Sequence, residues 1–174
     1  MQSRWRATTK EIIYDEKKLY NYGINRLSVR DYGRNELSKK MAKFQQDSDL
    51  INKALDKLEE QGYLSDERRT ISLLNQFSGR ESINKTKNRI YQKGLPKDLV
   101  QEVIENRTVE LEEDQESPEQ ITASELIEKK FRNFDVEKDD LKKTKEKMVR
   151  FLASKGFKYD DIKKAMSKFF TMDD

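Results

Sequence analysis

The sequence predicts an all-α protein built from three tandem three-helix repeats that form an elongated, curved helical array. A Lys-Gly pair followed by an apolar residue occurs at 93–95 and at 155–157, and a weaker version lies at 43–45. In each copy an apolar residue lies four positions before the glycine slot, and another apolar group begins six positions after it. That spacing is typical of a helix end, a turn and a second amphipathic helix. A period of roughly 50 residues indicates stacked helical units, because one such unit cannot bury its apolar stripe alone.

Composition supports an extended array with a thin core. Of the 174 residues 34% are apolar and 40% are charged, whereas a compact globule with a deep pocket would need more apolar residues. The chain has no cysteine and no histidine. This excludes thiol nucleophiles, imidazole bases, disulfides and the zinc sites that depend on these side chains. We therefore expect a protein that is not an enzyme and that needs no cofactor or metal.

The N-terminal arm and the first repeat are predicted to span 1–62. Thr8-x-x-Glu11 resembles a capping box, and apolar residues at helical spacing follow it, which predicts a helix over about 9–29. A second helix should follow Gly33. A third should start after the polar stretch at 45–48 and end at Gly62. No segment alternates apolar and polar residues for long enough to predict a strand.

Two further repeats are predicted at 63–106 and 122–174, separated by an acidic linker at 107–121. Pro96 stands where a first-turn proline belongs. The linker has no periodic apolar stripe and is rich in acids. Thr122-x-x-Glu125 is a second capping-box match and should begin the third repeat.

The net charge of +3 conceals an uneven distribution of charge along the chain. Residues 1–45 carry eleven basic residues against five acids, residues 101–128 carry ten acids and one arginine, and residues 129–174 carry fourteen basic residues against nine acids. A uniformly basic face would favour simple coating of DNA, whereas this pattern favours a protein partner of mixed charge. The start of the sequence lacks a hydrophobic secretion segment and the longest apolar runs are short, so we expect a soluble cytoplasmic protein.

Two basic groups are candidates for contact with an acidic surface. Arg26, Arg30 and Arg34 recur every four residues, and several basic residues lie between Arg80 and Lys97. The alternative for both groups is a solvated helix face. For Arg26, Arg30 and Arg34 this alternative is favoured over contact with a partner, and for the second group the two interpretations are equally supported. Acidic neighbours such as Asp139 with Asp140, or Asp160 with Asp161, point in different directions on a helix, so solvated helix starts explain them better than a metal site does.

Four motifs in the same order resemble the RecX family, the regulators of the bacterial recombinase RecA. The resemblance covers about Leu19 to Phe170, and its motifs are Leu27-Ser28-Val29-Arg30-Asp31 leading to Glu36-Leu37; Gly62-Tyr63-Leu64-Ser65-Asp66-Glu67-Arg68; Lys85-x-Lys87 before Lys93-Gly94-Leu95; and Arg150-Phe151-Leu152 through Lys155-Gly156-Phe157 to Ile162. Four positions depart from the family pattern. Gly33 replaces a frequent capping serine, which should weaken that helix start by a few tenths of a kcal/mol, Arg69-Thr70 replaces a Phe-Ala pair, and Thr86 replaces an apolar residue.

The resemblance implies three tandem three-helix repeats and a role that is not enzymatic. Members of the family lie in the helical groove of RecA filaments on single-stranded DNA, suppress ATP hydrolysis and strand exchange, and oppose filament growth. It implies RecA as the partner of a monomeric chain. Charge density and the matching motifs select the partner-binding candidates Arg26, Arg30, Arg34, Arg68, Arg80, Lys85, Lys87 and Arg89. The alternative is a helical protein that binds nucleic acid directly and competes for single-stranded DNA, with a steep salt dependence.

Overall fold

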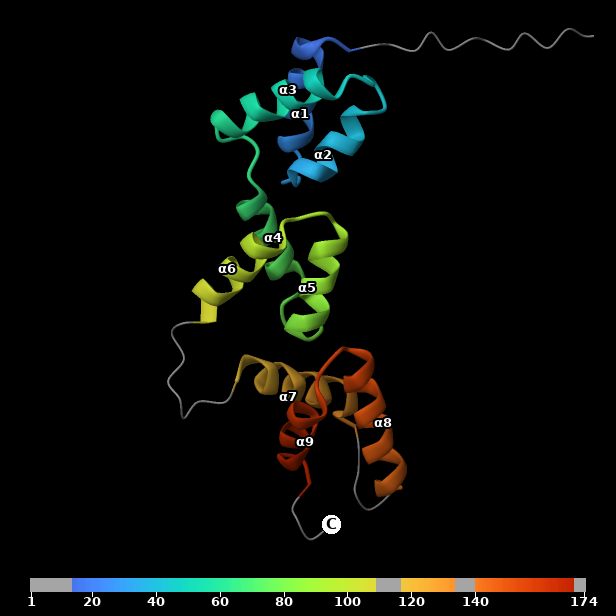
Figure 1. The fold of residues 1–174 in the computed structure, drawn as a ribbon. Helices are drawn as coiled ribbons and strands as arrows, with labels where there is room; N and C mark the ends of the chain where they lie inside the picture. The colour runs from blue at the N-terminus through green and yellow to red at the C-terminus, as the bar shows by residue number, and fades with distance from the viewer. Residues whose placement is uncertain (1–13, 109–116, 134–139, 171–174) are drawn as a thin grey trace, which may run out of the picture. The chain divides into compact units, whose positions relative to one another are not determined.

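The structure is a computed structural model that describes residues 14–108, 117–133 and 140–170 (Figure 1). Within those ranges it contains nine α-helices and no strand. The prediction of an all-α helical repeat fold is therefore confirmed. Contacts divide the chain into two compact units, Met1–Arg69 and Thr70–Asp174.

The first three helices are α1 (Glu16–Leu27), α2 (Arg34–Met41) and α3 (Ser48–Glu60). The helix predicted from residue 9 begins later, because the Asp15 carboxylate accepts a hydrogen bond from the Lys18 amide at 2.8 Å and so caps α1. The capping box at Thr8 to Glu11 lies outside the described residues. An aspartate also caps α3, since Asp47 accepts from the amides of Asp49 and Leu50.

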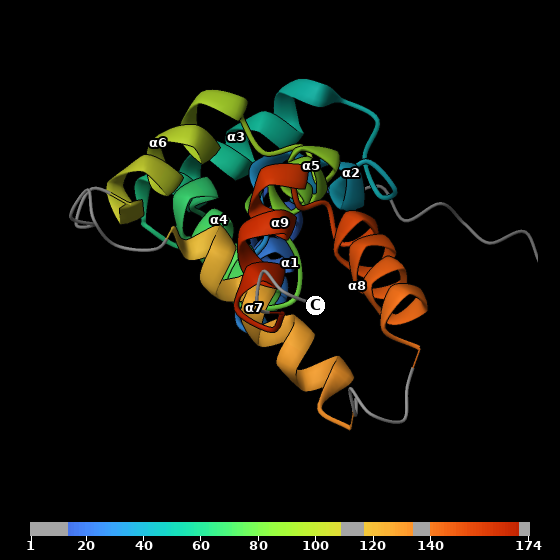
Figure 2. The ribbon, with the colours of Figure 1, turned by 90° about the horizontal axis from the view of Figure 1, so that it is seen from below.

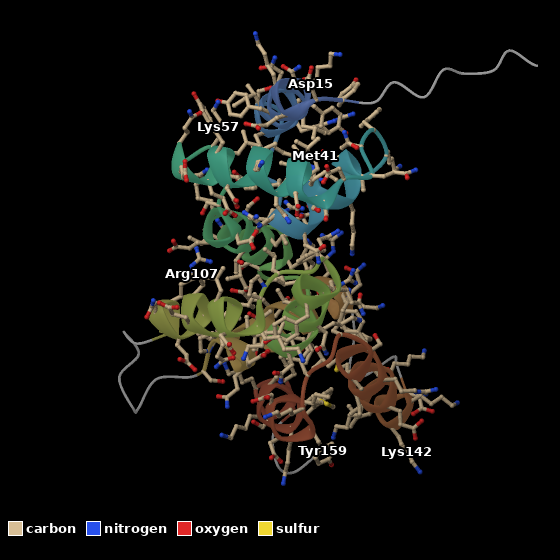
Figure 3. All side chains as sticks on the ribbon, turned by 45° about the horizontal axis from the view of Figure 1, so that its top comes forward. Asp15, Met41, Lys57, Arg107, Lys142 and Tyr159 are labelled. Carbon is tan, nitrogen blue, oxygen red and sulfur yellow. The ribbon has the colours of Figure 1, made fainter. Side chains whose placement is uncertain are left out.

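The first set of helices has its own core. Leucines from all three helices are fully buried in it, together with Met41, which is labelled in Figure 3. Gly23 lets α1 approach α3 closely, because a Cβ at this position would lie 2.4 Å from Leu58 Cδ1. The spacing of apolar residues in the sequence thus corresponds to the buried faces of these helices.

The second set is α4 (Asp66–Phe77), α5 (Ile83–Gln92) and α6 (Lys97–Thr108). The third set is α7 (Pro118–Phe131), α8 (Leu141–Ser154) and α9 (Tyr159–Ser167). The acidic linker is shorter than predicted: α6 continues to Thr108, and α7 starts at Pro118 and not at 122. The reason is that Ser117 caps α7 by accepting from the Gln120 amide, with the proline in the first turn.

The second and third sets each enclose a separate apolar cluster. Leu73, Ile90 and Val100 are fully buried in the second set, and Ile127, Met148 and Leu152 are almost fully buried in the third. Within the third set α9 packs against α7 and also contacts α8 (Figure 2). Each three-helix set therefore buries apolar surface of its own, as a repeat protein requires.

The end of α8 meets the start of α5 within the second unit. The Ser82 amide donates to Lys155 O at 3.0 Å, and the Ser82 hydroxyl donates to Gly156 O at 2.8 Å. Lys85 Nζ donates to Ser154 O at 2.6 Å. Carbonyls at the C-terminal end of α8, which have no partner within that helix, thus accept hydrogen bonds from residues at the start of α5.

Candidate partner-binding surfaces

Arg30 lies at the surface of the first set, where an acid and an aromatic ring contact its side chain. Its guanidinium lies 2.6 Å from Glu36 Oε1 and 3.7 Å from the centroid of the Tyr32 ring. Burial lowers the pKa of Arg30, but the hydrogen bond and charge of Glu36 outweigh burial and raise the pKa overall. The same carboxylate pairs with Arg69, which is only 6% exposed. Arg69, which replaces an apolar residue of the family pattern, is therefore accommodated by a buried ion pair.

Arg34 joins α2 to α3. Its guanidinium lies 2.6 Å from Asp56 Oδ1 and also pairs with Glu59. Burial lowers the pKa of Arg34, and the two carboxylates raise it above its ordinary value. The arginine is thus engaged by two acids of its own chain.

Arg68 ties two turns together. Its guanidinium donates to Gly62 O at 2.7 Å and to Tyr63 O at 2.8 Å, and it lies 3.8 Å from Asp31 Oδ1. The turn before α2 and the turn before α4 are therefore connected through one side chain.

The basic residues of α5 also have partners within the chain. Lys87 Nζ donates to Gln101 Oε1 of α6 at 2.7 Å. Arg89 lies 2.7 Å from the buried Glu81 carboxylate and 5.3 Å from the centroid of the Phe77 ring. Together with Lys85 at the junction described above, these residues stabilise the second unit.

Two of the eight basic candidates keep their charge available. Arg26 is exposed and lies 5.0 Å from the centroid of the Tyr22 ring. Arg80 is exposed, and its side chain has no hydrogen bond or ion pair among the described residues. The side chains of the other six candidates form contacts within the chain that stabilise the fold. The structure therefore distinguishes two residues with uncommitted charges from six residues with a structural role.

Two exposed apolar residues belong to the family motifs and were missed by reasoning from charge. Val29 is 80% exposed and Tyr63 is 50% exposed. They lie in or beside the turns that Arg68 connects. The sequence signal that could have identified them is an apolar residue inside a turn motif, where no buried helical stripe accounts for it.

Two carboxylates cap helices that precede them in the chain. Asp66, at the start of α4, accepts from the Arg34 amide at the start of α2 at 2.7 Å. Glu119, in the first turn of α7, accepts from the Ile83 amide at the start of α5 at 2.7 Å. Each three-helix set thus supplies an acceptor to the second helix of the set before it. Gly33, the N-cap of α2, has no side chain for this purpose, and Asp66 satisfies the adjacent amide.

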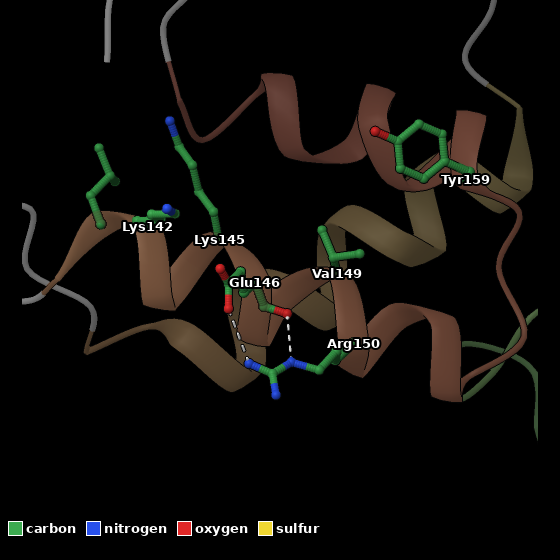
Figure 4. A pocket seen from close by; sticks show the side chains of 7 residues that line it. Lys142, Lys145, Glu146, Val149, Arg150 and Tyr159 are labelled. Carbon is green, nitrogen blue, oxygen red and sulfur yellow. Dashed lines mark hydrogen bonds and ion pairs between the residues drawn. The ribbon is translucent and has the colours of Figure 1, made fainter.

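A groove lies beside α8 on the third set (Figure 4). It encloses about 730 Å³ and has apolar walls formed by Leu141, Val149 and Tyr159. Charged side chains at its edges are Lys142, Lys145, Glu146 and Arg150. Tyr159 is 70% exposed, and both it and Lys142 are labelled in Figure 3. None of these residues was among the predicted candidates.

No group of three or more acidic side chains within the described ranges is arranged to hold a metal ion. Across the same part of the chain no helix is both long enough and apolar enough to cross a membrane.

A family model and two named proteins match this sequence. The model described as "RecX, third three-helix domain" matches residues 119–166, which include most of the third set and its groove. The "Regulatory protein RecX" of Clostridium perfringens (strain 13 / Type A) is 29% identical over 153 residues, which are 87% of this chain and 69% of the relative. The "Regulatory protein RecX" of Clostridioides difficile (strain 630) is 28% identical over 169 residues, or 95% of this chain and 75% of the relative.

The fold is also similar to a solved structure. The crystal structure of RecX from Lactobacillus salivarius superposes with a TM-score of 0.72 at 20% identity, covering 88% of this chain and 96% of that one. At that identity the likeness concerns the fold, and it agrees with the helical repeats described above. These matches and the motifs in the sequence support the RecX family as the family that this chain resembles.

Proposed function

We propose that this chain regulates the RecA recombinase by binding and not by catalysis. It would bind the RecA filament on single-stranded DNA, suppress ATP hydrolysis and strand exchange, and oppose filament growth, acting as a monomer in the cytoplasm. The observation that supports this most strongly is the correspondence of 95% of the chain to a protein named as a regulatory RecX. The four family motifs in the sequence support it further.

A binding protein can inhibit an assembly without chemistry. A ligand that binds one arrangement of the filament more tightly than another shifts the population toward that arrangement. Substrate turnover then falls because the arrangement that turns over becomes rarer. A chain with several separate helical sets offers contacts to more than one filament subunit.

Arg26 and Arg80 are the preferred interface candidates among the eight basic residues, because their side chains form no hydrogen bond or ion pair among the described residues, unlike those of the other six. Val29 and Tyr63 join them as exposed apolar residues of the family motifs. The other six remain candidates, but a substitution at any of them also removes a contact within the chain. Variants at those six positions therefore need a parallel measurement of stability.

The test is RecA-catalysed, single-strand-dependent ATP hydrolysis with this protein substoichiometric to RecA and with DNA in excess over both. Inhibition under these conditions supports action on the filament, since the protein is too scarce to cover the DNA. If inhibition appears only when the protein is abundant enough to cover the strand, direct competition for DNA is the better explanation and the proposal fails.

The variant R26E/R80E tests the interface. We expect it to need a higher concentration than wild type for half-inhibition, by about tenfold, because like charges across an interface are repulsive. The matched control is K53E/K129E, which makes the same change in net charge at two exposed lysines outside the candidate set. Equal loss in both variants would assign the effect to net charge and remove Arg26 and Arg80 from the interface.

A further inference from the structure

The groove beside α8 differs from the corresponding region of the second set. Lys87 and Val149 both lie seven residues before the glycine of the Lys-Gly pair, and Lys97 and Tyr159 both lie three residues after it. In the second set Lys87 donates to Gln101, and Lys97 lies over the Tyr91 ring. In the third set the corresponding positions hold Val149 and Tyr159, which line an open groove.

The length of α8 adds to this difference. It has 14 residues, whereas α5 has 10. Because both helices end at a Lys-Gly pair, the additional turn lies at the start of α8, where Leu141 and Lys142 contribute to the groove. One end of the groove is therefore built from residues that have no counterpart in α5.

Two of the apolar residues that line the groove, Leu141 and Val149, are partly buried against the core of the third set, and the third is the exposed Tyr159. Tyr159 is 70% exposed, and within the described residues its hydroxyl has no hydrogen bond and its ring has no aromatic partner. An exposed aromatic residue next to a branched aliphatic one is a typical anchor position in protein recognition. The groove thus has room and apolar contact area for one bulky side chain of a partner.

The charges around the groove indicate what the partner carries. Lys142, Lys145 and Arg150 stand against a single acid, Glu146, which lies 3.4 Å from Arg150 on the exposed surface. The Lys145 ammonium also lies 4.7 Å from the centroid of the Phe170 ring. A net positive edge favours an acidic partner.

A peptide fits these walls better than single-stranded nucleic acid does. Tracks for single strands combine a continuous positive surface with several aromatic platforms for bases. Here the walls are mainly aliphatic, one aromatic ring is present, and Glu146 interrupts the positive edge. Apolar grooves with charged edges are the usual receptors for amphipathic peptide segments.

We propose that the groove beside α8 binds an acidic protein segment that inserts a bulky apolar side chain between Val149 and Tyr159. The segment's carboxylates would face Lys142, Lys145 and Arg150. This proposal rests on the proposed function only in assuming that the chain acts by binding another protein.

The test uses a short fluorescein-labelled peptide with a central Phe-Leu pair flanked by Asp and Glu, titrated with the full chain and followed by fluorescence anisotropy. We expect saturable binding. We expect Y159A and K142E/R150E each to weaken binding by about tenfold. The matched controls are I121A, which removes an exposed apolar side chain of α7 outside the groove, and K163E/K164E, exposed lysines of α9 outside the groove. Far-UV circular dichroism checks that every variant keeps its helices.

The outcomes separate this proposal from the proposed function. Absence of peptide binding, or equal weakening by groove and control variants, overturns the groove proposal whatever the ATPase assay shows. Binding of an oligo-dT in place of the peptide, lost in the groove variants, makes the groove a nucleic-acid site and also overturns the proposal. Peptide binding that depends on the groove supports it even if RecA is not inhibited.

Discussion

The carboxyl group of Glu119 is partly buried. It accepts from the Ile83 amide, which makes it the acceptor for the start of α5. Burial, the largest effect, raises the pKa of Glu119, and the negative charge of Asp161 raises it further. The hydrogen bond from Ile83 and the positive charge of Lys158 lower the pKa, but the net effect is a rise. Because the folded pKa lies above the unfolded value, the folded state holds this proton to higher pH. The contribution of Glu119 to stability is therefore greatest in acid and falls as pH rises through the folded pKa.

E119Q should show this dependence directly. Glutamine keeps an oxygen that accepts from the Ile83 amide but carries no charge, so it resembles the protonated glutamate. We expect the free energy of unfolding of wild type to fall relative to E119Q as pH rises from acid toward neutrality. Urea titrations of both proteins over that range provide the measurement. A difference that stays constant with pH, or grows in favour of wild type, would contradict the raised pKa.

Gly156 is a second residue with a defined role. Its φ is +90°, and a Cβ there would lie 2.8 Å from Ser82 Oγ and 2.9 Å from Lys85 Cβ. G156A should therefore lose roughly 1–2 kcal/mol through backbone strain and more through the crowded junction with α5. G79A is the matched control, since Gly79 has a φ of +68° but has nothing within 4 Å of its Cβ position. Equal losses in chemical denaturation would show that the junction tolerates the methyl group.

At the level of helices, α2 illustrates what the sequence predicted and what it did not. A helix after Gly33 was predicted, and its Leu37 and Met41 side chains are both fully buried. Gly33 predicted a weak start, because reasoning from local sequence considers caps only from neighbouring residues. The acceptor for Arg34 comes instead from Asp66, more than thirty residues away in the chain. Contacts of that separation leave no periodic signal in the sequence.

D66A tests this distant cap. Loss of the acceptor should cost about 1 kcal/mol, the usual effect of removing a helix cap. The loss should be concentrated in the first unit, where hydrogen exchange of the α2 amides would accelerate. E67A is the control, because Glu67 is the exposed neighbour on the same helix. If E67A destabilises as much as D66A, the effect belongs to the charge at the start of α4 and not to the cap.

The candidate surfaces were less predictable than the helices. Arg30 and Arg80 lie in turns and the other six basic candidates lie on helices. All but Arg26 and Arg80 have a hydrogen-bond or ion-pair partner within the described part of the chain. Those partners, such as Glu36 for Arg30 and Gln101 for Lys87, become visible only when helices are packed together. The groove beside α8 was missed for a related reason. Val149 is partly buried against the core of the third set and also lines the groove, and the spacing of apolar residues in the sequence indicates only the first of these roles.

Across the whole molecule, three separate apolar cores predict that stability is not uniform. Leu55 is fully buried in the first set, and Leu152 is fully buried in the third. L55A should cost about 2–5 kcal/mol as a cavity-forming substitution. Because local units open independently when few contacts join them, we expect faster hydrogen exchange in α1, α2 and α3 and wild-type exchange in α7 to α9.

Hydrogen exchange followed by mass spectrometry measures this effect helix by helix. L152A is the reciprocal variant, and it should accelerate exchange in the third set while leaving the first set unchanged. Acceleration spread evenly over all nine described helices in either variant would mean that the chain unfolds as one cooperative block.

The distant caps at Asp66 and Glu119 also bear on how the chain folds during its own synthesis. A ribosome releases the chain from its N-terminus, so α2 leaves before the carboxylate that completes its start has been made. The same delay applies to α5, because its start is completed by hydrogen bonds to Glu119 and to Gly156 O, both of which are synthesised later. Each set thus becomes complete only after part of its successor has emerged. Nascent chains halted shortly before either acid should consequently be more open to proteases than chains halted shortly after it.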